Sequence, residues 1–223
     1  MKIMHAFFVS LLLMPSISLA QGRWDTASSV GFSPRAALTS CVVDNKIYAI
    51  GGYDDTAYLN TLEVFDPGLN SWSTPITTGT FTARRGMTSA VVGGKIYVMG
   101  GYDGKNWLNT LEVFDTSNNV WSTPITTGIF TAREKLCSSV IDGKIYVMGG
   151  YNGVIHLNTL EIFDPLTNIW RTPQTTGTFT ARRGLSPAVV TGRIYCMVSL
   201  NGGKMNWKTL DVFDPIQTHD RTP

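Results

Sequence analysis

Arginine recurs through the sequence at intervals of 49 residues, at Arg35, Arg84, Arg133 and Arg182. A guanidinium is always charged and binds carboxylates or phosphates through paired hydrogen bonds. If the four lie on one face, they would form a collar for an anionic ligand, so we take them as candidate binding residues. A residue that returns in every unit nevertheless favours an architectural role, in which the guanidinium bonds to the Gly-Gly turn or to neighbouring carbonyls.

A carboxylate also recurs, at Glu63, Glu112, Glu161 and Asp211. Its regular place suggests a structural or solvent-facing group, and pairing with lysine or arginine across neighbouring strands would explain it.

Aromatic residues form a second set of candidate binding residues. They lie in the least repetitive segments, 53–58, 102–107, 151–156 and 200–207, at Tyr58, Trp107 and Trp207, with His156 at the corresponding place. Varied loops on a rigid scaffold often bind partners, and aromatic rings are favoured at interfaces. The alternative is that these rings cap the repeating units, since aromatic burial stabilises any small sheet.

Residue types for metal or nucleophilic chemistry are poorly represented. Beyond residue 20 the histidines are His156 and His219, which lie in different units. The sequence has no Gly-x-Ser-x-Gly motif, and no cysteine lies beside a histidine. We therefore expect no metal site, no cofactor and no catalytic residue.

These residues are set in a repeat of 49 residues. Segments 95–102 and 144–151 both have the sequence KIYVMGGY, and segments 59–66 and 108–115 both have LNTLEVFD. The structural markers of the units are glycine doublets and tryptophans: Gly51, Gly52, Gly100, Gly101, Gly149, Gly150, Trp72, Trp121 and Trp170. Similarity at a fixed period of this length indicates a repeat architecture.

Each unit divides into four short strands. An apolar strand such as 89–92 is followed by a tight turn, Gly93-Gly94, whose residue type tolerates positive φ. The second strand, 95–99, ends at the glycine doublet, the third, 110–114, alternates apolar and polar residues, and tryptophan opens the fourth. Four such strands cannot bury both faces alone, so we expect the sheets to stack around an axis with the indoles between them.

The pattern resembles the kelch repeat, in which a glycine doublet closes the second strand after an aromatic residue and a Phe-Asp turn precedes a tryptophan. The match extends from Arg35 to about Pro215. The resemblance implies an all-β kelch-type β-propeller of about four blades, each of four antiparallel strands. The units would span roughly 35–76, 84–125, 133–174 and 182–215.

The fourth unit departs from this pattern. Val198-Ser199 replace the glycine doublet, and Asp220 stands where tryptophan belongs. Segment 21–27 contains Trp24 and is similar to a tryptophan strand without its three companions. We therefore expect this N-terminal strand to complete the last blade, which would protect exposed sheet edges. The alternatives are a truncated larger propeller and a ring that a second chain completes.

Residues 1–20 have the features of a signal peptide. Lys2 precedes an apolar run over 6–14, and Ser18-Leu19-Ala20 places small residues before Gln21. The run is shorter than the ~20 residues of a bilayer span. We expect residues 21–223 to be secreted or periplasmic, without a membrane span.

The charge and the cysteines indicate little specific chemistry. A formal net charge of +2 gives no indication of a nucleic-acid partner. Cys41, Cys137 and Cys196 lack metal-site spacing and are expected as small buried strand residues, with one disulfide as the alternative in an oxidising compartment.

The predicted function is a non-enzymatic binding module that presents its loops to a protein or glycan partner. The alternative is a carbohydrate-active enzyme, because some exported kelch proteins are sugar mutarotases. In that case Arg133 and Glu134 would be the candidate pair for proton transfer. Nothing in the sequence identifies the ligand.

Overall fold

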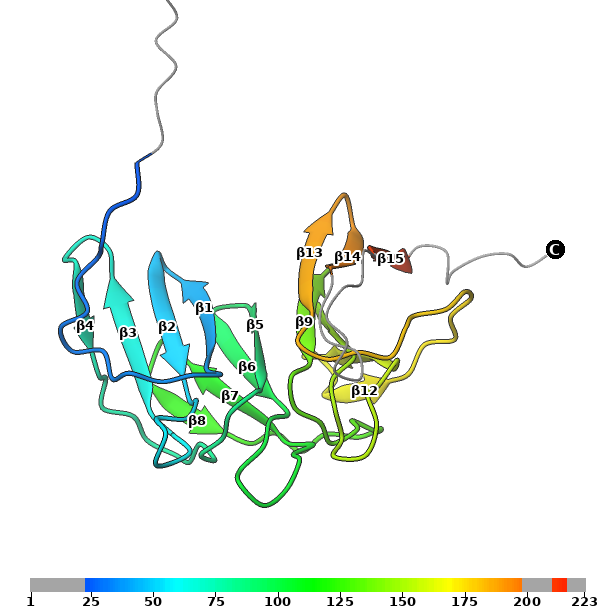
Figure 1. Ribbon diagram of the computed structural model, residues 1–223, viewed down its shortest axis with the longest axis horizontal. Helices are drawn as coiled ribbons and strands as arrows, with labels where there is room; N and C mark the ends of the chain where they lie inside the picture. Colours follow the sequence, from blue (N-terminus) through cyan, green and yellow to red (C-terminus); the bar gives the residue numbers. More distant parts are fainter. Residues whose placement is uncertain (1–22, 198–209, 216–223) are drawn as a thin grey trace, which may run out of the picture.

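The structure is a computed structural model that describes residues 23–197 and 210–215. The described residues form fifteen antiparallel strands in four sheets, which follow one another around an arc (Figure 1). The predicted four-bladed all-β propeller is confirmed. The expected signal peptide, residues 1–20, and the loop residue Trp207 lie outside the described residues.

Strands pair in sequence order within each blade. The first blade contains β1 (Thr39–Val43), β2 (Lys46–Ile50), β3 (Leu62–Asp66) and β4 (Ser71–Ser73). The second contains β5 (Thr88–Val92), β6 (Lys95–Met99), β7 (Leu111–Asp115) and β8 (Val120–Ser122). The third contains β9 (Cys137–Ile141), β10 (Lys144–Met148), β11 (Leu160–Asp164) and β12 (Ile169–Arg171). The fourth has three described strands, β13 (Ser186–Val190), β14 (Arg193–Met197) and β15 (Asp211–Phe213).

The tight turns between the first two strands of each blade adopt the predicted positive φ angles. Asp44 and Asn45 have φ of 48° and 60°. Thr191, whose residue type is poorly suited to this conformation, still has φ of 49°, followed by Gly192 at 74°. The register imposed by the neighbouring strands therefore outweighs the local preference of threonine.

The apolar core consists of three clusters, one between each pair of consecutive blades. Trp121 is only 4% exposed and lies between Phe81, at 4.5 Å between ring centroids, and Phe114, at 5.0 Å. Trp170 has the same arrangement in the third blade. These two indoles fill the space between sheets as predicted, whereas Trp72 in the first blade is half-buried.

The repeat arginines lie inside the fold. The Arg84 side chain is fully buried, and its guanidinium donates to the Gly100 carbonyl at 3.0 Å, to Thr110 Oγ1 at 2.8 Å and to the carboxylate of Glu112. Arg35, Arg133 and Arg182 form the corresponding ion pairs with Glu63, Glu161 and Asp211. The arginines are therefore not open to a ligand in this structure, and the glutamates are buried ion-pair partners rather than solvent-facing groups.

The backbones of Arg84, Arg133 and Arg182 bond to the preceding blade. The Gly52 amide donates to the Arg84 carbonyl at 2.8 Å, and the Arg84 amide donates to the Leu59 carbonyl at 3.1 Å. A Cβ added at Gly51 would come within 2.8 Å of that same Arg84 carbonyl. Gly51 is thus required because the arginine of the following blade passes too close for a side chain, whereas a Cβ at Gly52 would come within 2.9 Å of the Ala36 carbonyl of its own blade.

The expected N-terminal closing strand is not formed. Residues 23–27 are not strand, and Trp24 is fully exposed. The chain that leads into a blade bonds to the outer strand of that same blade: Trp72 Nε1 donates to the Ser28 carbonyl at 3.0 Å, as the Trp121 amide donates to the Thr78 carbonyl at 2.8 Å. This attachment keeps the N-terminal segment beside the first blade.

The arc stays open between the first and fourth blades (Figure 1). The innermost strands pack in the order β1 on β5, β5 on β9 and β9 on β13. Among the described residues, no core cluster joins the fourth blade to the first.

Replacing Arg84 tests the importance of the buried ion pair. We expect Arg84→Met to lower the free energy of unfolding by about 3–5 kcal/mol, because it leaves the Glu112 carboxylate buried without its countercharge. The double variant Arg84→Met/Glu112→Leu should recover much of that loss, since an apolar pair replaces both charges. Urea denaturation measures both values.

The matched control is Lys95→Met. It removes a surface pair in which Lys95 Nζ lies 3.1 Å from Asp115, and such pairs contribute about 0–1 kcal/mol. Equal destabilisation by Arg84→Met and Lys95→Met would contradict the stabilising role assigned to the buried ion pair between Arg84 and Glu112.

Candidate functional site

The loops between the second and third strands are compact and well bonded. Each of the three described loops closes through an antiparallel bridge between its first and last residues, as between Tyr102 and Trp107. Within that loop, Asp103 Oδ1 accepts hydrogen bonds from the amides of Lys105 and Asn106 at 2.8 and 2.6 Å. Loops held in this way present their side chains in fixed positions.

Six rings from three of these loops form a continuous chain, which we call the aromatic row. Successive centroids lie 5.0–6.0 Å apart, in the order Tyr53, Tyr58, Tyr102, Trp107, Tyr151 and His156. The structure thus brings together three of the four loop residues predicted from sequence, and each of the three is half-buried.

The rings also join neighbouring blades. A Cβ added at Gly153 would come within 2.5 Å of the Trp107 ring, and one added at Gly104 would come within 2.7 Å of Tyr58. Each ring therefore packs against the loop of the next blade. The rings thus cap the repeating units, which is the alternative considered from the sequence. The aromatic row also remains partly open to solvent.

Charged residues lie beside the aromatic row at one position of the repeat. This position directly follows the buried arginine and is occupied in turn by Ala36, Arg85, Glu134 and Arg183. The Arg85 guanidinium lies 5.5–5.8 Å from the ring centroids of Tyr53, Tyr58 and Tyr102, a favourable cation–π arrangement. From the sequence, Glu134 was a candidate only as a proton-transfer partner of Arg133, and Arg85 and Arg183 were not candidates. The change of charge at this position, within a near-identical repeat, was the signal that could have identified it.

Several buried polar atoms on this face have no hydrogen-bond partner. They are Arg85 Nε, Trp107 Nε1, Glu134 Oε2, His156 Nε2 and Arg183 Nε. Glu134 is only 6% exposed, and its Oε2 lies 4.0 Å from Arg85 Nε, beyond hydrogen-bond reach. Leaving a buried polar group unpaired costs about 1–3 kcal/mol. Among the described residues of this face, four donor or acceptor nitrogens and one carboxylate oxygen are therefore buried without a hydrogen bond.

The candidate proton-transfer pair is not formed. The Arg133 guanidinium donates to the Gly149 carbonyl at 2.9 Å and to the carboxylate of Glu161, not to Glu134. The expectation of an Arg133–Glu134 pair is therefore wrong, because the fold places the two side chains in different environments.

Within residues 23–197 and 210–215, no three His, Cys, Asp or Glu side chains are grouped so that they could hold a metal ion. The same ranges contain no helix with the length and apolarity needed to span a membrane.

The cysteines are free and lie in the strands. Cys137 and Cys196 are 3% and 2% exposed, which confirms the prediction that they are buried. Cys41 is half-buried, and loss of solvation raises the pKa of its thiol to about 11. It is therefore a poor nucleophile at neutral pH.

The protonation of His156 can be tested by titration. Burial, helped by the positive charge of Arg183, lowers the pKa of His156 below 6.5. Because the folded state then binds the proton less readily than the unfolded chain, this residue should reduce stability as the pH falls through 6.5. We expect an NMR midpoint below 6.5 and an upward shift in Arg183→Gln. The surface variant Arg171→Gln should leave the midpoint unchanged, and an equal shift in both variants would contradict the assignment.

Comparison with known proteins agrees with this geometry. The sequence model of the KLHDC2/KLHL20/DRC7 Kelch-repeats domain matches residues 13–203. Kelch-like protein 4 of Homo sapiens is 38% identical over 58 residues, which are 25% of this chain and 8% of that protein. Rab9 effector protein with kelch motifs of Rattus norvegicus is 38% identical over 68 residues, which are 29% of this chain and 18% of that protein.

The matched stretches thus span less than a fifth of these relatives. The family match, in contrast, covers most of the chain and includes all the described blades up to β14. The structure also has the features of this family: glycine doublets, tryptophans buried between blades, and four-stranded sheets whose strands pair in sequence order. The chain therefore belongs to the kelch-repeat family.

Proposed function

We propose that this protein binds a protein partner through the aromatic row and the charged residues beside it. Kelch-repeat propellers are typical protein-binding domains, which supports a protein partner in general terms. The observation that carries the proposal is the group of five buried, unpaired polar atoms on this face. Buried polar atoms are ordinarily paired, so their gathering on one face favours a bound partner that supplies the missing bonds.

The chemistry of the face favours a polypeptide segment as the bound group. Trp107 Nε1 can only donate a hydrogen bond, whereas the Glu134 carboxylate accepts one. A peptide backbone offers both a carbonyl and an amide at short intervals, so one segment can satisfy both. The rings of the aromatic row supply the apolar contact area that interfaces favour.

The face also contains positive charge on either side of Glu134. Arg85 lies over the rings of the first two loops, and Arg183 lies 5.1 Å from the centroid of Tyr151. A segment of alternating polarity fits this arrangement better than a uniformly charged one, because like charges placed opposite each other are destabilising.

Selection from a displayed random-peptide library tests the proposal. We expect the protein to enrich peptides whose affinity falls about tenfold or more in Glu134→Gln, since truncating one partner of a buried charged hydrogen bond costs roughly 2–5 kcal/mol. The variant preserves the shape of the side chain. Arg171→Gln, at an exposed site on β12, is the matched control and should leave affinity unchanged.

A glycan array forms the second arm of this experiment. Glycan binding that depends on Glu134, together with no enrichment of peptides, would overturn the proposal in favour of a carbohydrate ligand. Peptide binding that is indifferent to both Glu134→Gln and Trp107→Ala would place the site elsewhere. The melting temperature of each variant shows whether a loss of binding reflects unfolding.

We also propose that the protein acts after export, on the strength of the leader-like residues 1–20. N-terminal sequencing of the protein expressed from the full reading frame should then begin at Gln21. An intact Met1 on protein recovered from the cytoplasm would contradict export.

A further inference from the structure

The junction between the third and fourth blades differs from the first two junctions in one polar contact. At each of the first two, a hydroxyl on the innermost strand of one blade lies 2.7–2.8 Å from a hydroxyl on the innermost strand of the next, in the pairs Thr39–Ser89 and Thr88–Ser138. At the third junction the corresponding residues are Cys137 on β9 and Pro187 on β13. The hydroxyl pair is therefore lost where these two strands pack together.

A second cysteine lies at the same junction. Cys196 stands directly opposite Pro187 in the register of β13 and β14. Its place in the second and third units is held by valine, and the place of Cys137 in the first two units is held by threonine. Two changes to cysteine thus occur together, at the one junction of a near-identical repeat that lacks the hydroxyl pair.

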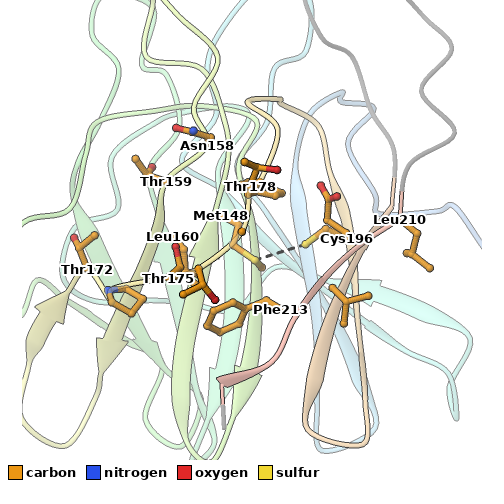
Figure 2. Close-up of a pocket in the computed structure, with 16 residues that line it drawn as sticks. Met148, Asn158, Thr159, Leu160, Thr172, Thr175, Thr178, Cys196, Leu210 and Phe213 are labelled. Atoms are coloured by element: carbon orange, nitrogen blue, oxygen red, sulfur yellow. Dashed lines mark hydrogen bonds between the residues drawn. The ribbon is translucent and has the colours of Figure 1, made fainter. Parts of the chain in front are cut away.

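The two thiols meet beside Met148. Cys137 lies opposite Met148 in the register of β9 and β10, and its Sγ is 3.8 Å from the Met148 carbonyl oxygen. Figure 2 shows the Cys196 thiol directed at the Met148 side chain, with 3.6 Å between Sγ and Sδ. The thiols of Cys137 and Cys196 are also hydrogen-bonded to each other. Two cysteines whose thiols point at one another across two strands have the arrangement that a disulfide requires.

The surroundings favour the thiolate form at Cys196. The hydrogen bond with Cys137, helped by the positive charge of Arg182, lowers the pKa of Cys196 below its ordinary value, against the opposing effect of burial. The same hydrogen bond and burial raise the pKa of Cys137. Because the thiolate is the nucleophile in thiol–disulfide exchange, Cys196 is the thiol that reacts first.

The remaining cysteine has no comparable partner. Cys41 packs against the core cluster between the first and second blades, whereas Cys137 and Cys196 belong to the cluster between the third and fourth. The three thiols therefore divide into one pair and one single residue, and Cys41 serves as an internal control.

We propose that Cys137 and Cys196 form a disulfide that joins the third blade to the fourth. The oxidant is a small-molecule disulfide of the glutathione type. The Cys196 thiolate attacks one sulfur of this disulfide and releases one glutathione, which leaves a mixed disulfide on Cys196. Cys137 then loses its proton, attacks Cys196 Sγ and releases the second glutathione. The two protein thiols are oxidised to one disulfide, and the oxidant is reduced to two thiols, which take up the two protons.

The bond takes the place of the missing hydroxyl pair. The fourth unit also departs from the repeat in its buried ion pair, because Arg182 is paired with the shorter carboxylate of Asp211 where the other units have glutamate. A disulfide between strands of two blades restricts the unfolded chain and thereby stabilises the folded one. The covalent bond thus compensates at the junction where the noncovalent contacts of the repeat are altered.

Mapping of unreduced peptides from the full chain tests the proposal. The protein is incubated to equilibrium with oxidised glutathione in urea just below its unfolding transition, because both thiols are buried and exchange only when the blades open. We expect the chain to become lighter by two hydrogen atoms and its tryptic peptides 136–144 and 194–204 to be cross-linked. Cys41→Ser is the matched control and should form the same cross-link.

The melting temperature shows whether the bond joins the blades in their native arrangement. We expect the oxidised chain to melt roughly 5–15 °C above the reduced chain, and dithiothreitol to abolish the difference. The shift should persist in Cys41→Ser and be absent in Cys137→Ser and Cys196→Ser. Thiols that stay free at Cys137 and Cys196, a bond that includes Cys41, or a cross-linked chain that melts no higher than the reduced one would each overturn the proposal.

Discussion

A buried ion pair at each junction between blades is the interaction on which this architecture depends. The guanidinium of Arg84 satisfies the carboxylate of Glu112 and the carbonyl of Gly100 inside one blade, while the backbone of Arg84 bonds to the blade before it. A buried charge is tolerated only when its partners are fixed, so the arginine, its carboxylate and the glycine doublet recur together in the first three units. This requirement explains why these residues return every 49 positions in those units.

The same constraint separates the residues that hold the blades together from the residues that we propose bind a partner. The arginine guanidiniums form ion pairs inside the fold and are not open to a ligand. The residue that follows each arginine takes no part in these ion pairs. There the charge changes from Arg85 to Glu134 and back to Arg183, next to rings that cross from blade to blade. Sites that depart from the local rules of a fold are commonly functional. The unmet hydrogen bonds gather on the loop face, which is where we propose that a partner binds.

Much of the fold could be predicted from the sequence because repetition makes short patterns unambiguous. The strand 95–99 and the turn at Gly93-Gly94 follow from local residue types, and the structure confirms both. The role of Arg84 could not be predicted in the same way. Its carboxylate partner lies 28 residues away, in a strand that no local rule connects to it.

The N-terminal strand illustrates a different limit. Trp24 matches the local pattern of a tryptophan strand, but a pattern does not say which blade receives it. The hydrogen bond between Trp72 and the Ser28 carbonyl holds the following residues on the first blade. Tyr58, Trp107 and His156 could be identified from the sequence as candidate residues, but their contacts could not, since Tyr58 and Tyr102 become neighbours only when two blades pack together.

Native-state hydrogen exchange of the amides of Gly52, Gly101 and Gly150 tests the central role of the arginine junction most directly. These amides donate to the carbonyls of Arg84, Arg133 and Arg182 and so report on each junction separately. If the junctions hold the blades together, they should exchange as slowly as amides in the core strands β6 and β10, through global unfolding. Rapid exchange at these glycines, with the core strands still protected, would show that the blades separate without unfolding and would contradict the account.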